Sequence, residues 1–207
     1  MYRRHLKHSR VKNLFKFVSA KMHTVFTVES SLEFDACFHL EYSPLVKHFE
    51  AQPEGFYYQC DGRLCPYTPD FRVVDQDGFA SFLEVKPAEK VADQDFLLRF
   101  PLKQQRALEL SSPLKLVTEK QIRINPILGN LKLLHRYSGF QSFTPLHMQL
   151  LKLVEDLGHV SLSTVSGTMS VPPEEVFASA LSLLASGLID SDLTSREIDL
   201  SSVVWVR

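Results

Sequence analysis

Two acidic residues and a lysine are spaced in a way that could support chemistry. Pro69 and Asp70 are followed, after thirteen residues, by Glu84, Val85 and Lys86. Side chains alternate between the two faces of a strand, so Glu84 and Lys86 point to the same side. If a hairpin turns midway between the two acids, Asp70 lies opposite Glu84. Like charges this close raise each other's pKa, and a divalent cation relieves the repulsion.

Magnesium is the cation that such a site favours. Mg²⁺ takes oxygen ligands in octahedral geometry and keeps several waters. We therefore expect Asp70, Glu84 and the carbonyl of Val85 to bind Mg²⁺, or Mn²⁺ in its place, together with a DNA phosphate oxygen. The metal makes a nucleophile of bound water, which Lys86 can orient or help to deprotonate. This chemistry is phosphodiester hydrolysis. The alternative is a surface ion pair on a solvated sheet face.

Turn signals predict the sheet that would carry these residues. Asp-Gly pairs at 61–62 and 77–78 separate three segments rich in aromatic and β-branched residues. Such pairs are strong hairpin signals, and Pro87 ends the third segment. We therefore predict a three-stranded antiparallel meander over residues 56–87.

Helices are predicted on both sides of the meander. Ser30 and Glu33 form a capping-box pattern that marks the start of a helix over 31–42. After the meander, apolar spacing predicts a helix, a short strand and a second helix, at 102–110, 114–118 and 127–137 respectively. The alternation of helices and strands indicates an α/β layer arrangement.

The C-terminal part has a different pattern. Apolar spacing predicts three helices and two short terminal strands, at 145–157, 163–169, 172–186, 188–190 and 203–206. This is the outline of a winged helix. Residues 141–207 carry three basic and eight acidic groups, and the third helix offers Glu174, Glu175, Ser179 and Ser182 in place of the basic and amide side chains that read bases. We expect this domain to bind proteins; the alternative is that it only shields the core.

Charge is distributed unevenly along a chain of 207 residues with a net charge of -1. Residues 1–22 hold seven basic groups and no acid. This basic arm is the leading candidate for contact with DNA, with Lys103 second, and the alternative is a solvated tail. No stretch approaches the roughly 20 apolar residues of a membrane span and no secretory signal is evident. We therefore expect a cytoplasmic protein, nucleoid-associated when bound to DNA. Three cysteines without a second pair of zinc ligands are expected to be thiols.

The acidic pair and lysine resemble the core of the PD-(D/E)xK nucleases, which have the restriction-endonuclease-like fold. More narrowly, four segments are similar in order and wording to the N-terminal domain of TnsA-type transposon endonucleases: 29–33, 50–53, 67–71 and 84–87. The similarity continues through 130–134, and the winged-helix outline agrees with the second domain of that family. The resemblance thus covers nearly the whole chain.

The resemblance implies roles for individual residues. Glu33, Asp70 and Lys86 would form the catalytic set, with Glu84 in the remaining core position and Glu33 among the metal ligands. Glu33 also has a structural role as a cap, and Glu29 is the competing candidate. Gln52 matches a family pattern without a distinct chemistry.

The resemblance also implies a function and partners. TnsA-type proteins cut double-stranded DNA at the 5′ ends of a transposon. A DDE-type transposase subunit, TnsB, cuts and joins the 3′ ends, and an AAA+ ATPase, TnsC, regulates the assembly. We therefore expect a Mg²⁺-dependent endonuclease subunit of a cut-and-paste transposase. Two alternatives stay open: a stand-alone nuclease of the resolvase or restriction type, and a nuclease-like adaptor that bridges proteins and DNA without cutting.

The expected organisation has three parts. A basic arm covers 1–22. An endonuclease domain covers 23–140 and has an α/β restriction-endonuclease-like core, with a mixed sheet flanked by helices. A winged-helix protein-interaction domain covers 141–207.

Overall fold

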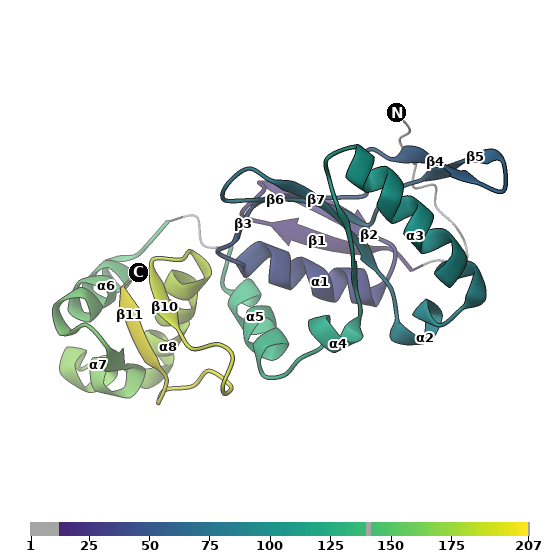
Figure 1. Cartoon of the computed structure of the whole chain (residues 1–207). Coiled ribbons are helices and arrows are strands. Elements are labelled where there is room, and N and C mark those ends of the chain that lie inside the picture. Colours follow the sequence, from purple (N-terminus) through teal and green to yellow (C-terminus); the bar gives the residue numbers. More distant parts are fainter. Residues whose placement is uncertain (1–12, 140–141, 207) are drawn as a thin grey trace. The chain divides into compact units, whose positions relative to one another are not determined.

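The computed structural model describes residues 13–139 and 142–206 (Figure 1). The chain forms two compact units, the first ending at Ile124 and the second beginning at Asn125. The boundary therefore lies before helix α5 (Ile127–Arg136), whereas the sequence analysis placed it after that helix. The reason is tertiary packing, since α5 packs against α8 (Pro173–Ala185) of the second unit.

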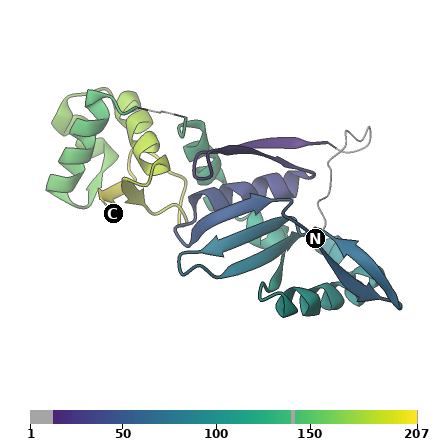
Figure 2. The ribbon, with the colours of Figure 1, turned by 90° about the horizontal axis from the view of Figure 1, so that it is seen from above.

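The first unit is a mixed α/β structure. Its elements are, in chain order, β1 (Phe15–Ser19), β2 (Thr24–Val28), α1 (Ser31–Tyr42), β3 (Val46–Ala51), β4 (Phe56–Cys60), β5 (Arg63–Tyr67), β6 (Phe71–Asp75), β7 (Ala80–Val85), α2 (Ala88–Val91), α3 (Gln94–Glu109), β8 (Leu114–Val117) and α4 (Glu119–Ile122). Four strands form a sheet in the order β3-β6-β7-β8, in which only β8 runs parallel to its neighbour. Figure 2 shows α1 between the β1–β2 hairpin and this sheet, with α3 on the opposite side. The predicted mixed sheet flanked by helices is thus confirmed.

The predicted meander is wrong in its middle strand. The segment 63–75 divides into β5, which pairs with β4, and β6, which pairs with β3 and β7. Proline has no N–H to donate to a ladder, and Pro69 lies where the two strands separate. The backbone of Asp70 instead forms hydrogen bonds with Leu83 and Gln52, on the side of the larger sheet. The β4–β5 hairpin is consequently a separate two-stranded sheet.

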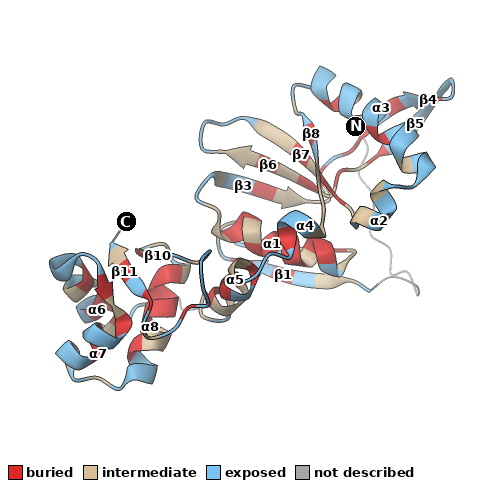
Figure 3. Ribbon diagram, turned by 60° about the horizontal axis from the view of Figure 1, so that its bottom comes forward, coloured by how far each residue is buried: buried red, intermediate tan, exposed pale blue. Residues whose placement is uncertain are grey.

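A hydrophobic core lies on the α3 side of the sheet, where the side chains that alternate toward that face of β7 pack. Phe82 and Leu114 on neighbouring strands pack with Phe100 and Ala107 of α3, and aromatic residues of the β4–β5 hairpin complete the cluster. Figure 3 shows buried residues along α1 and through the strands, and exposed ones along the outer face of α3. The helix predicted over 102–110 begins earlier, at Gln94, and continues through Pro101. A proline inside a helix costs about 3 kcal/mol, and α3 buries Phe100 and Ala107 on its inner face.

Part of the predicted basic arm belongs to the folded unit. Strand β1 pairs with β2 along its whole length. The Nζ of Lys21 donates hydrogen bonds to the carbonyls of Leu40, Ser43 and Val46, at 3.0, 2.9 and 3.1 Å, beside the C-terminal end of α1. Lys21 is therefore a structural cation. The rest of the arm, residues 1–12, lies outside the described residues.

The second unit contains the helices and terminal strands that the sequence predicted. After α5 come α6 (Pro145–Leu157), β9 (Val160–Ser161), α7 (Leu162–Met169), α8, β10 (Ile189–Ser191) and β11 (Val203–Val206). The strands form an antiparallel sheet in the order β10-β11-β9, of which β9 was not predicted. No helix in the described part of the chain has the length and apolar character needed to cross a membrane.

Candidate active site

The backbone of Asp70 is held by both strands that flank β6. Its N–H donates to the carbonyl of Leu83 at 3.0 Å, and its carbonyl accepts from the N–H of Gln52 at 2.8 Å. Its Oδ2 accepts a hydrogen bond of 2.7 Å from the N–H of Val85. Main-chain groups therefore hold the backbone of Asp70 at two points and its carboxylate at one.

The hairpin register agrees with the prediction. Phe71 pairs with Leu83, and Arg72 pairs with Phe82. Continued by one residue, this antiparallel register places Asp70 opposite Glu84. The two acids therefore lie on the same face of neighbouring strands, as their spacing indicated.

Glu84 is buried and has a partner on each carboxylate oxygen. The hydroxyl of Tyr67 donates to its Oε2 at 2.5 Å. The Nζ of Lys86 lies 3.5 Å from its Oε1, and the Lys86 side chain remains 38% exposed. Lys86 can thus contact Glu84 and a ligand in solvent at the same time.

Glu33 lies in the first turn of α1 and forms the predicted cap. The Oγ of Ser30 accepts a hydrogen bond from the N–H of Glu33 at 3.1 Å. The carboxylate of Glu33 accepts in return from the Ser30 hydroxyl at 2.8 Å and from the N–H of Glu29 at 3.0 Å. These bonds orient the buried carboxylate. Its predicted role as a metal ligand stays a prediction.

All the predicted site residues line one cavity of about 460 Å³. Its wall is made of Glu29, Ser30, Glu33, Pro66, Tyr67, Thr68, Asp70, Glu84, Val85, Lys86 and Lys103. The sequence analysis gave Tyr67 no role and considered Lys103 only as a DNA contact. Tyr67 stands beside Pro69 and Asp70 in the sequence, which was the one available signal, whereas only the fold brings Lys103 here.

The electrostatics of the cavity favour a cation among the acids. Burial raises the pKa of Asp70 well above its usual value, and the carboxylates of Glu84 and Glu33 raise it further. The Val85 N–H and the charge of Lys86 act in the opposite direction with smaller effect. A divalent ion would relieve this repulsion, so the donor set has the chemistry that Mg²⁺ requires.

The acids do not form a ready-made site of three side-chain ligands. Within residues 13–139 and 142–206, no group of three or more His, Cys, Asp or Glu side chains is placed to hold a metal ion. Mg²⁺ needs only one or two carboxylates from a protein, because waters and substrate oxygens complete its shell. Asp70 and Glu84 match that number of carboxylates, and their role as metal ligands stays a prediction. The three cysteines are free thiols.

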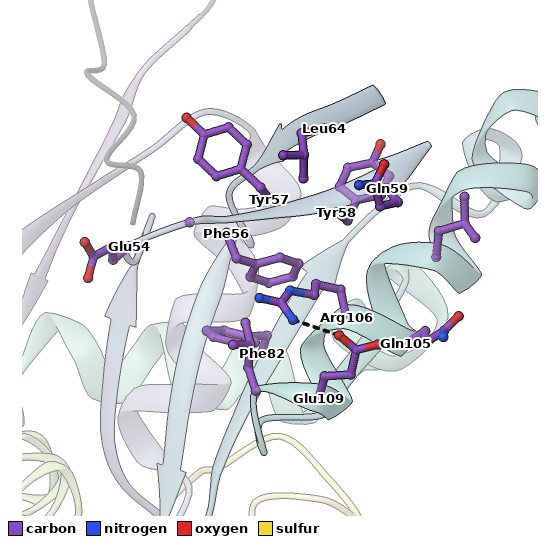
Figure 4. A pocket seen from close by; sticks show the side chains of 13 residues that line it. Glu54, Phe56, Tyr57, Tyr58, Gln59, Leu64, Phe82, Gln105, Arg106 and Glu109 are labelled. Carbon is purple, nitrogen blue, oxygen red and sulfur yellow. Dashed lines mark hydrogen bonds and ion pairs between the residues drawn. The ribbon is translucent and has the colours of Figure 1, made fainter. Parts of the chain in front are cut away.

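A second, roomier cavity of about 680 Å³ lies between β4 and α3. Figure 4 shows the rings of Phe56 and Phe82 beside Arg106, whose guanidinium pairs with Glu109 at 2.7 Å. It shares no wall residue with the acidic cavity. The predicted site residues therefore line only the smaller of these two cavities.

Comparison with known proteins adds no relative. No protein-family model matches the chain, and no curated protein matches it significantly. The likeness to TnsA-type endonucleases accordingly rests on the sequence segments quoted above.

Proposed function

We propose that this chain is a Mg²⁺-dependent DNA endonuclease and a subunit of a heteromeric cut-and-paste transposase, which hydrolyses phosphodiesters at the 5′ ends of the transposon. The observation that carries the proposal is the facing register of Asp70 and Glu84, with Lys86 beside Glu84 in one acidic cavity. The four-stranded mixed sheet with α1 and α3 on opposite sides supports a restriction-endonuclease-like core.

In the proposed hydrolysis, the residues of the cavity have separate roles. Asp70 and Glu84, with the carbonyl of Val85 and Glu33 as further candidates, would hold Mg²⁺. The bound metal would supply Lewis acidity and a water of lowered pKa. Lys86, kept close to Glu84 yet partly exposed, would orient the attacking water or help to deprotonate it. The Val85 N–H and the Tyr67 hydroxyl keep the two acids in position.

We further propose that the second unit is a winged-helix domain that binds protein partners. Its helix α8 is buried over most of its length, and Ser179 and Ser182, expected on an exposed face, are in fact buried. Glu174 and Glu175 remain exposed in the first turn. A helix that forms the centre of its own core and presents acids is poorly suited to a DNA groove.

Strand mapping on transposon-end DNA tests the proposal. The chain is incubated with Mg²⁺ or Mn²⁺, with and without the partner transposase, as wild type, Asp70→Ala and Lys86→Ala. Exposed Asp77→Ala and Lys115→Ala serve as matched controls. We expect breaks at the 5′ ends that need the partner, vanish in the two site variants and persist in the controls. Equal cutting by Asp70→Ala and wild type would contradict the proposal, and partner-independent cutting would favour the stand-alone nuclease.

The adaptor is the second candidate. It is favoured by one observation: the carboxylate of Glu33 is engaged in the helix cap, and no trio of ligands is assembled among the described residues. Calorimetric titration with Mg²⁺ and Mn²⁺ separates the two candidates. A nuclease binds the ion and loses it on Asp70→Asn, whereas an adaptor shows no binding in either form.

A further inference from the structure

Lys103 brings a second cation to the acidic cavity from an element outside the sheet. It lies on α3, which packs against β4 and β8. Its Nζ is 4.3 Å from the ring centroid of Tyr67 and 6.0 Å from that of Tyr58. An ammonium group at this distance from an aromatic face is attracted by the negative face of the ring. The two tyrosine rings thus hold the ammonium of Lys103 at the cavity wall through cation–π contacts.

The other cations of α3 have acidic partners, whereas Lys103 has none in the described part of the chain. Arg99 pairs with Asp95 at 2.7 Å, and Arg106 pairs with Glu109 at the same distance. Among the residues that the structure describes, the Nζ of Lys103 forms no ion pair. Burial lowers the pKa of Lys103, while Glu84 favours its charged form. Lys103 is therefore a desolvated cation with capacity for an anionic ligand.

An acidic cavity repels a phosphate unless cations line it as well. Lys86 lies close to Glu84, so part of its charge is compensated within the site. Tyr67 contacts both Lys103 and the acid pair. Its hydroxyl donates a hydrogen bond to Glu84, and its ring lies beneath the ammonium of Lys103. One side chain thus contacts both an acid of the cavity and Lys103.

We propose that Lys103, seated on Tyr67, binds a phosphodiester oxygen of the DNA strand in the cavity. The inference rests on the proposed nuclease function and adds the residue that binds the negatively charged phosphate of the substrate. Lys103 and Lys86 then have separate tasks, since Lys103 contacts phosphate and Lys86 acts beside Glu84. Tyr67 is a positioning residue for both the acid and the cation.

The salt dependence of DNA binding tests this role without requiring any cutting. Affinity for a short duplex is measured by fluorescence anisotropy in Ca²⁺ from low to moderate salt. One phosphate contact contributes about 0.9 to the slope of log affinity against log salt. We expect Lys103→Gln to lower that slope by about one and to weaken binding at low salt by roughly tenfold. Exposed Lys115→Gln, with the same change of charge, keeps the wild-type slope.

Two further variants guard against a folding artefact. Lys103→Arg keeps the charge and is expected to retain most of the affinity. Lys103→Met keeps an unbranched apolar stem on the tyrosine rings and replaces Lys103→Gln if thermal unfolding shows that Lys103→Gln is unfolded. Identical affinity and slope for Lys103→Gln and Lys115→Gln would overturn the inference, as would a wild type that does not bind the duplex at low salt.

Cutting assays run in parallel distinguish this inference from the proposed function. A wild type that binds DNA through Lys103 but does not cut transposon-end DNA with Mg²⁺ and the partner transposase present refutes the nuclease and leaves the phosphate contact standing. A wild type that cuts, with kcat and KM unchanged in Lys103→Gln, refutes the phosphate contact alone.

Discussion

The hydroxyl of Tyr67 donates a 2.5 Å hydrogen bond to Oε2 of Glu84 and so joins two separate sheets. Tyr67 ends β5 in the two-stranded hairpin, whereas Glu84 lies on β7 in the four-stranded sheet. The orientation of one acid of the candidate site is therefore coupled to the seating of the β4–β5 hairpin.

Removing that hydroxyl should weaken the fold. Tyr67→Phe leaves Oε2 of Glu84 buried without its donor, so we expect the free energy of unfolding to fall by about 1 to 3 kcal/mol. Urea unfolding followed by circular dichroism measures the change. Tyr137→Phe is the control, because the Tyr137 hydroxyl makes no hydrogen bond within the described residues. An equal loss in both variants would contradict the role assigned to Tyr67.

Neutralising Asp70 should stabilise the chain above neutral pH. Burial and the nearby carboxylates raise its folded-state pKa, whereas the unfolded chain ionises near the ordinary value of about 4. The folded state is therefore progressively destabilised as pH rises from about 4 through the raised pKa. We expect Asp70→Asn to gain on the order of 1 kcal/mol at pH 8. The gain should shrink toward pH 4, where both states bind the proton. Thermal unfolding at the two pH values measures it, with exposed Asp77→Asn as control.

Mg²⁺ should stabilise the wild type and not the Asp70→Asn variant. A ligand that binds only the folded state at 100 times its Kd adds about 2.7 kcal/mol to the free energy of unfolding. Differential scanning fluorimetry measures the shift in Tm, and NaCl of matched ionic strength controls for screening. The same rise in Tm for both proteins would place the metal somewhere other than beside Asp70.

Lys21 should matter for stability and not for DNA binding. Its three hydrogen bonds to the carbonyls of Leu40, Ser43 and Val46 are lost in Lys21→Met. We expect the free energy of unfolding to drop by about 2 kcal/mol, since charge-assisted hydrogen bonds contribute more than neutral ones. Urea unfolding tests this, with Lys115→Met as control. Weaker DNA binding by an otherwise stable Lys21→Met protein would restore Lys21 to the basic arm.

Asn130 should be needed for the second unit. Its buried amide donates to the carbonyls of Leu193 and Arg196, at 2.9 and 2.8 Å, and accepts from the N–H of Ile198 at 2.9 Å. Asn130→Ala leaves these main-chain groups without partners, so we expect a loss of about 3 kcal/mol. Gln149→Ala, at an exposed position of α6, is the control. Limited proteolysis should then cleave the second unit first, and a protection pattern like that of wild type would refute the role.

Local signals in the sequence predicted the parts that depend on neighbouring residues. The capping pattern at Ser30 and Glu33 predicted the start of α1, because a helix start is decided by hydrogen bonds within four residues. The Asp-Gly turn between β6 and β7 likewise predicted the register that opposes Asp70 and Glu84. The acidic pair of the site could therefore be read from spacing alone.

Long-range packing decided the rest. The β1–β2 hairpin and β3 lack strong turn signals, and their pairing depends on α1 and β6. The separation of β5 from β6 depends on the backbone hydrogen bonds that Asp70 forms with Gln52 and Leu83, which lie far from it in the sequence. Lys103 reaches the cavity only because α3 packs across β4 and β8, and α5 joins the second unit only because α8 buries it. Chain spacing carries no information on such contacts. The sequence thus determined the acidic pair, Asp70 and Glu84, and its register. The tertiary structure decided that Lys103, Tyr67 and helix α3 surround the pair.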